Sequence, residues 1–128
     1  MAIRGSEMKH ILTTPEGGRA VVDLQEDIVL YSAPRNPPNT GLAYTRGTDL
    51  YMHSSRAGRK YFYVHRWSMW QGEQPSFELI SEDAAKNFIL QRATNHGYVA
   101  DGIRVDNCKE VFGEDLFTHL LFEKMRKA

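Results

Sequence analysis

The chain has 128 residues, of which 41% are apolar and 25% are charged, and these values are typical of one folded domain. Sixteen basic residues balance sixteen acidic ones, so the formal net charge is zero, which argues against a dedicated non-specific binder of nucleic acid or membrane surfaces. A single cysteine, Cys108, excludes an intramolecular disulfide and the zinc sites that are built on cysteine pairs.

The N-terminal segment has no apolar signal core, and no apolar run approaches the roughly 20 residues that a membrane-spanning helix needs. We therefore expect a cytoplasmic protein that contacts no membrane. Residues 1–7 are expected to form a disordered extension, and residues 8–128 a single α+β domain.

Short strands are expected in the first part of the chain. Apolar-rich segments at 8–13, 19–23 and 28–33 predict three of them, the first two joined through a turn that contains Gly17 and Gly18. Residues 34–47 are rich in proline, asparagine and glycine, and they predict a long loop.

The clearest pattern is a long antiparallel hairpin over residues 48–70, with Arg56-Ala57-Gly58-Arg59 between its strands. Centring its turn between Ala57 and Gly58 gives three expected cross-strand pairs: Leu50 with His65, Met52 with Tyr63, and Asp49 with Arg66. In that register His53 and His65 lie on opposite faces and could not share a metal ion.

Helical spacing replaces the strand pattern after residues 76–80, which predict one more strand. Ser81 is a favourable N-cap for a helix that ends near Asn95-His96-Gly97. Asn107 and Glu110 have the spacing of a capping box, and residues 114–126 carry the apolar stripe of a last helix.

This order predicts the α+β class. We expect an antiparallel sheet of four to six strands, made from N-terminal hairpins and the central hairpin 48–70. Two or three C-terminal helices should pack on one face of that sheet.

No motif specifies a reaction, because HExxH, EF-hand and phosphate-loop patterns are all missing from the sequence. We therefore expect no catalytic residue, no metal ligand and no cofactor. Cys108 would suit a nucleophile beside a helix N-terminus, but a buried and unreactive cysteine is the favoured interpretation.

Basic side chains at the tip of the central hairpin are interleaved with the aromatic side chains of its second strand. The candidate residues for binding a partner or nucleic acid are Arg56, Arg59, Lys60, Tyr61, Tyr63, His65 and Trp67. Such residues stack on bases, neutralise phosphates or anchor protein interfaces, although aromatic residues also fill protein cores.

The sequence favours a small non-enzymatic binding or accessory domain that acts through protein–protein contacts or self-association, with residues 67–70 in the interface. One alternative is a nucleic-acid-binding domain that uses the basic-aromatic hairpin 56–67. Another is a small hydrolase or transferase without a recognisable motif.

Overall fold

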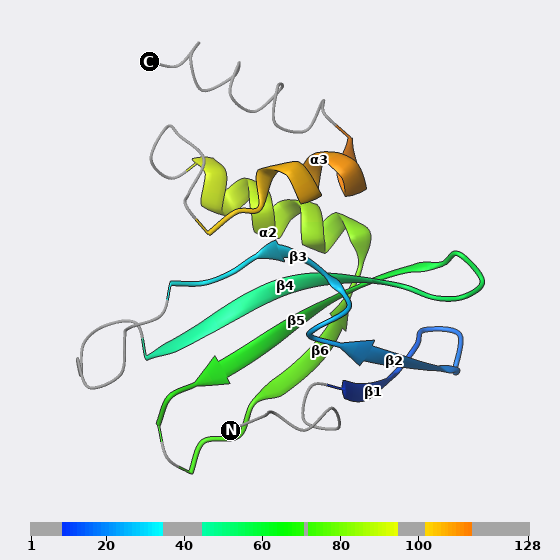
Figure 1. The fold of residues 1–128 in the computed structure, drawn as a ribbon, viewed down its shortest axis with the longest axis horizontal. Helices are drawn as coiled ribbons and strands as arrows, with labels where there is room; N and C mark the ends of the chain where they lie inside the picture. Colours follow the sequence, from blue (N-terminus) through cyan, green and yellow to red (C-terminus); the bar gives the residue numbers. More distant parts are fainter. Residues whose placement is uncertain (1–8, 35–44, 71, 95–101, 114–128) are drawn as a thin grey trace.

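The computed structural model describes residues 9–34, 45–70, 72–94 and 102–113. Antiparallel strands form a two-stranded sheet, β1-β2, and a four-stranded sheet in the order β3-β4-β5-β6 (Figure 1). The strands are β1 (Lys9–Thr13), β2 (Arg19–Asp23), β3 (Ile28–Tyr31), β4 (Arg46–Ser54), β5 (Lys60–Ser68) and β6 (Ser76–Ile80). The helices are α2 (Glu82–Thr94) and α3 (Val105–Phe112), so the described part of the chain is an α+β arrangement.

Both helices pack on one face of the four-stranded sheet (Figure 1). Ala85 and Ile89 lie one turn apart on α2, and both are fully buried against the sheet. The buried side chains of this helix-side core are Leu30, Leu50, Met52, Phe62, Val64, Ala85, Ile89, Ile103 and Cys108. Burial of each large apolar side chain contributes about 1.5–3 kcal/mol, and among the described residues this layer holds more buried apolar side chains than the opposite face.

The β1-β2 hairpin covers part of the opposite sheet face. Val22 is fully buried there against Tyr51 and Tyr63, and the His10 ring stacks on Phe77 of β6 at 3.8 Å between centroids. The expected single sheet is therefore two sheets, because the N-terminal hairpin packs on the face of the larger sheet instead of extending its edge.

The central hairpin forms over residues 46–68, but the expected register is wrong by one residue. Its loop has three residues between Ser55 and Arg59: Gly58 donates to the Ser55 carbonyl at 3.0 Å and has a φ of 83°. The turn is thus centred on Ala57, as in a hairpin whose type I turn is followed by a left-handed glycine.

That one-residue difference exchanges the partners across the hairpin. Leu50 pairs with Val64, Met52 with Phe62, and Asp49 with His65, while Arg66 faces Thr48 and makes an ion pair with Glu78. His53 and His65 consequently share one face of the sheet, contrary to the expectation.

The segment before α3 covers the edge of β3. Ser32 donates to the Gly102 carbonyl at 2.8 Å, and Arg104 donates to the Leu30 carbonyl at 3.0 Å. Asn107 is not the cap that its spacing suggested: it lies inside α3, and its amide donates to the Val29 carbonyl at 2.9 Å. Ser81 does cap α2, accepting from Ala84 N–H at 3.0 Å.

Three expectations fall outside the described residues: the N-terminal extension 1–7, most of the loop 34–47, and the last helix 114–126. Within the described ranges, no helix is both long and apolar enough to cross a membrane.

Candidate functional site

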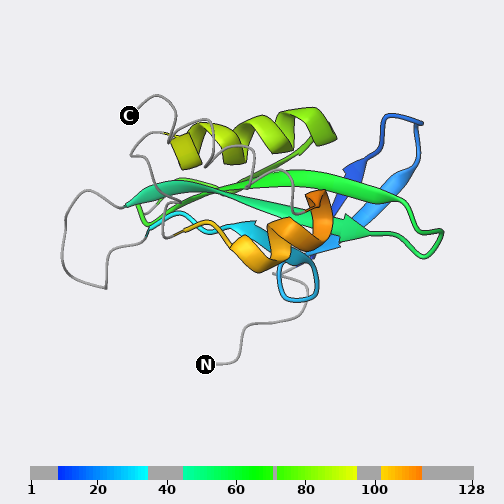
Figure 2. The same ribbon diagram turned by 90° about the horizontal axis from the view of Figure 1, so that it is seen from above.

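The three basic candidates lie together at the end of the central hairpin. Arg56, Arg59 and Lys60 are exposed, and the loop 55–59 projects past the start of α2 (Figures 1 and 2). Arg59 makes an ion pair with Glu16 in the β1-β2 turn, with its Nη1 2.8 Å from Oε1. A hydrogen bond with Tyr61 and the charge of Glu16 raise the pKa of the Arg59 guanidinium.

Most of the aromatic candidates point into the protein. Tyr63 is fully buried and stacks on Tyr51, with 5.2 Å between ring centroids. Trp67 is buried and donates from Nε1 to Asp49 at 3.0 Å, and the half-buried His65 ring stacks on Phe77. Tyr61 is thus the one member of the aromatic set that lies beside the exposed cations.

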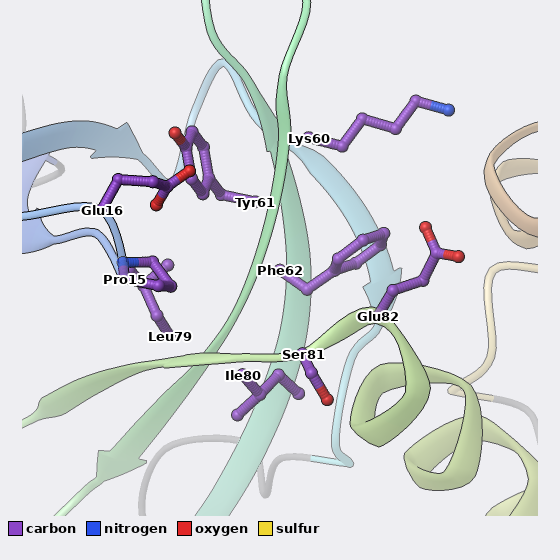
Figure 3. A pocket seen from close by; sticks show the side chains of 9 residues that line it. All are labelled: Pro15, Glu16, Lys60, Tyr61, Phe62, Leu79, Ile80, Ser81 and Glu82. Atoms are coloured by element: carbon purple, nitrogen blue, oxygen red, sulfur yellow. The ribbon is translucent and has the colours of Figure 1, made fainter. Parts of the chain in front are cut away.

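A groove of about 370 Å³ runs between the β1-β2 turn, β5 and the start of α2. Figure 3 shows Tyr61 on the Glu16 side of β5, and Lys60 and Phe62 on the α2 side with Glu82. Charges of both signs line this groove, so it has no clear preference for a cation or an anion.

A buried carboxylate holds a histidine on the same sheet face as Tyr61. Asp27 Oδ1 lies 2.7 Å from His53 Nδ1, and Asp27 Oδ2 accepts from the Tyr63 hydroxyl at 2.7 Å and from Asp23 N–H at 2.8 Å. Burial and the neighbouring Asp27 raise the pKa of Tyr63, so its hydroxyl stays a donor. Sequence patterns could not reveal this cluster, because Asp27 and His53 are 26 residues apart and no motif joins them.

The turn after β5 carries two exposed apolar side chains, Met69 with 47% and Trp70 with 54% of its surface exposed. We call residues 68–70 and 72–73, together with Thr45 and Arg46, the Trp70 loop. It lies at the end of β5 opposite the projecting hairpin loop (Figure 1). Trp70 Nε1 donates to Thr45 Oγ1 at 3.0 Å, and Met69 N–H donates to the Thr45 carbonyl at 2.8 Å.

Glu73 closes the Trp70 loop. Its carboxylate accepts from Arg46 Nε at 2.9 Å and from Arg46 Nη2 at 2.6 Å, and it also accepts from the Ser68 hydroxyl. The hydrogen bonds from Arg46 and then Ser68 lower the pKa of Glu73 to about 2. The Glu73 carboxylate therefore stays ionised over the whole physiological pH range, and its hydrogen bonds to Arg46 and Ser68 link this loop to β4 and β5.

Cys108 is buried, which confirms the favoured interpretation of the sequence. It lies in α3, and its thiol donates to the Leu30 carbonyl at 3.4 Å. Burial raises the pKa of the Cys108 thiol to about 12. A thiol that stays protonated and inaccessible cannot serve as a nucleophile at neutral pH.

This shift predicts a pH dependence of stability. The folded-state pKa lies above the ordinary thiol value of 9.0, so the unfolded chain releases this proton first as the pH rises. Stability should therefore fall between about pH 9 and about pH 12, and the fall should be shallower in Cys108→Ala. Urea unfolding across this range measures it. An equally steep fall of stability with pH in both proteins, or rapid labelling of the native thiol at pH 8, would contradict the burial of Cys108.

No group of three or more metal-ligating side chains occurs in the described ranges. Comparison of this chain with protein-family models, with curated proteins and with solved structures finds no match.

Proposed function

We propose that this chain is a binding domain that associates with a second copy of itself, with the Trp70 loops of two copies in contact. The observation that carries the proposal is an exposed Trp70 beside an exposed Met69, on a turn that hydrogen bonds hold in one conformation. Tryptophan and methionine are enriched in protein interfaces, and tryptophan is a frequent energetic anchor.

The bracing of the turn matters for affinity. Association must offset the entropy lost when interface side chains and loops are ordered, about 0.5–1.5 kcal/mol for each immobilised side chain. In the Trp70 loop that ordering is already provided by Glu73, Ser68 and Thr45. Trp70 is therefore presented at a lower entropic cost than on a free loop.

The charges around Trp70 favour a copy of the chain as the partner. A two-fold interface must be self-complementary, so each residue that meets a partner group is met in return by its counterpart. Arg46 and Glu73 place one cation and one anion beside the apolar centre, which is the simplest self-complementary rim. The zero net charge leaves little overall repulsion between copies.

Sedimentation equilibrium over a range of protein concentrations tests this proposal. We expect a monomer–dimer equilibrium for the native chain and a dimer weakened roughly 30-fold or more in Trp70→Ala, because loss of a central tryptophan costs about 2 kcal/mol or more. Trp70 is exposed, so the variant should fold normally, as circular dichroism can verify.

Ile11→Ala is the matched control, since Ile11 is another exposed apolar residue but lies on the outer face of β1. It should dimerise like the native chain. The proposal would be overturned if the native chain stayed monomeric at about 500 μM, a concentration well above the dissociation constants of specific interfaces. Equal dimerisation of the native chain and Trp70→Ala would overturn the assigned surface.

A further inference from the structure

A second cavity, separate from the Trp70 loop, lies between β2 and the end of the central hairpin. Its volume is about 450 Å³, within the range of small-ligand sites. We call it the His53 pocket. Its lining residues are Arg19, Ala20, Val21, His53, Ser54, Ser55, Arg56 and Tyr61.

Six of the eight residues that line the His53 pocket have a side chain that can donate a hydrogen bond. Arg19 and Arg56 bring guanidinium groups, and Ser55 and Tyr61 bring hydroxyls, whereas the Ser54 hydroxyl donates to Met52 Sδ. None of the lining residues carries a carboxylate. Guanidinium groups and hydroxyls together form the donor set that proteins use for phosphate.

The two lining arginines are available for a ligand. Arg59 is held by Glu16 and Arg66 by Glu78. Arg19 and Arg56, in contrast, make no ion pair with any residue in the part of the chain that the structure describes.

His53 is oriented by the network behind it. An ionised carboxylate only accepts hydrogen bonds, so the 2.7 Å contact with Asp27 places the ring proton on Nδ1. Asp27 is itself held by the Tyr63 hydroxyl and by Asp23 N–H, which fixes the imidazole. Within the described residues Nε2 makes no hydrogen bond, so it is the ring nitrogen left for a ligand, and it donates to a phosphate oxygen when the imidazole carries both ring protons.

Tyr61 adds an aromatic face to these donors. It pairs directly with His53 across the central hairpin, so the two rings lie on the same face of the sheet. A tyrosine face beside guanidinium groups suits a planar base, and base–aromatic stacking contributes about 1–3 kcal/mol.

We propose that the His53 pocket binds the phosphate group of a nucleotide, free or within a single strand, with Arg19, Arg56 and His53 at the phosphate and Tyr61 at the base. The site is independent of self-association, because it lies at the opposite end of β5 from the Trp70 loop. The two proposals can therefore fail separately.

NMR titration of the ¹⁵N-labelled full chain tests the site with three probes: adenosine 5′-monophosphate, inorganic phosphate and adenosine. We expect the two phosphate-bearing probes to shift the amide signals of residues 53–56, and the nucleotide to bind more tightly than phosphate alone. Adenosine without phosphate should bind much more weakly than the nucleotide. Phosphate contact should also move the His53 Nε2 signal, which a purely structural histidine would not show.

Arg56→Gln is the diagnostic variant, because Arg56 is exposed and its replacement should leave the fold intact. We expect a roughly tenfold loss of nucleotide affinity from the missing charged hydrogen bonds. Arg66→Gln is the matched control, since Arg66 is an exposed arginine outside the pocket, and it should bind like the native chain.

A labelled ten-nucleotide single strand distinguishes the two sources of phosphate. Recognition within a strand predicts tighter binding than the mononucleotide and a salt dependence that grows with each neutralised phosphate. Recognition of a free nucleotide predicts that the mononucleotide binds at least as well as the strand. The proposal would be overturned if about 10 mM nucleotide, a concentration well above those that fill ordinary metabolite sites, caused no signal shift. It would also be overturned if Arg56→Gln left the nucleotide affinity unchanged.

Discussion

Asp27→Ala is expected to lower the free energy of unfolding by about 3–5 kcal/mol, because it removes one partner of a buried charged network. The Asp27 side chain is only 6% exposed and accepts from His53, Tyr63 and the Asp23 backbone. Without it, the Tyr63 hydroxyl is left in the core with its acceptor removed, at the cost of desolvation without a hydrogen bond. Urea unfolding of the two proteins measures the difference.

Glu26→Ala is the matched control, since Glu26 is an exposed acid in the same turn, and it should change stability by about 0.5 kcal/mol or less. Tyr63→Phe provides a second comparison. It should cost less when Asp27 is already alanine than in the native chain, because the hydroxyl then has no acceptor to lose. Additive effects of Asp27→Ala and Tyr63→Phe would show that the network carries no coupling energy.

Asp49→Ala should destabilise the chain by a similar amount, about 3–5 kcal/mol. Asp49 is 1% exposed, and its Oδ1 accepts from Ala33 N–H at 2.8 Å and from Trp67 Nε1 at 3.0 Å. The variant deprives two donors of this acceptor and leaves space beside the Trp67 ring. Urea unfolding of the two proteins measures the loss.

Asp49→Asn distinguishes the carboxylate from the space it fills. The amide oxygen keeps one acceptor, so this variant should cost clearly less than alanine. Asp106→Ala, an exposed acid on α3, should be close to neutral. Loss of no more than about 1 kcal/mol in Asp49→Ala would mean that the buried carboxylate is not needed to hold β3 and β5 together.

The succession of elements could be predicted from local patterns. Short apolar-rich runs mark the strands, and Ser81 with the spacing of Ala85 and Ile89 marks α2. These signals depend on residues close together in the chain, which is why they can be read without a structure.

The hairpin register could not be fixed in the same way. Both strands of the central hairpin are apolar on both faces, so the pattern does not select one pairing. The choice rests on the conformation of Gly58: its positive φ produces a three-residue loop in place of the expected two-residue turn. Because of this one-residue difference, Tyr63 and Trp67 have cross-strand partners other than the expected ones.

The candidate sites could not be predicted in full from the sequence, because their residues lie far apart along the chain. Basic residues at the hairpin end were apparent in the sequence, but Arg19 reaches the His53 pocket from β2, more than 30 residues away in the sequence. The clamp between Arg46 and Glu73 likewise joins residues 27 apart in the sequence. The expected interface segment 67–70 divides in the structure into a buried Trp67 and an exposed Met69 and Trp70.

Mixing two charge-reversed variants tests self-association through the Trp70 loop most directly. Arg46→Glu gives copies with two acids beside Trp70, and Glu73→Arg gives copies with two bases, so each alone should sediment as a monomer through like-charge repulsion. An equimolar mixture should form heterodimers, because the opposite charges then face each other across the two-fold axis. Dimers of either variant alone that are as stable as those of the native chain would contradict a two-fold contact at this loop.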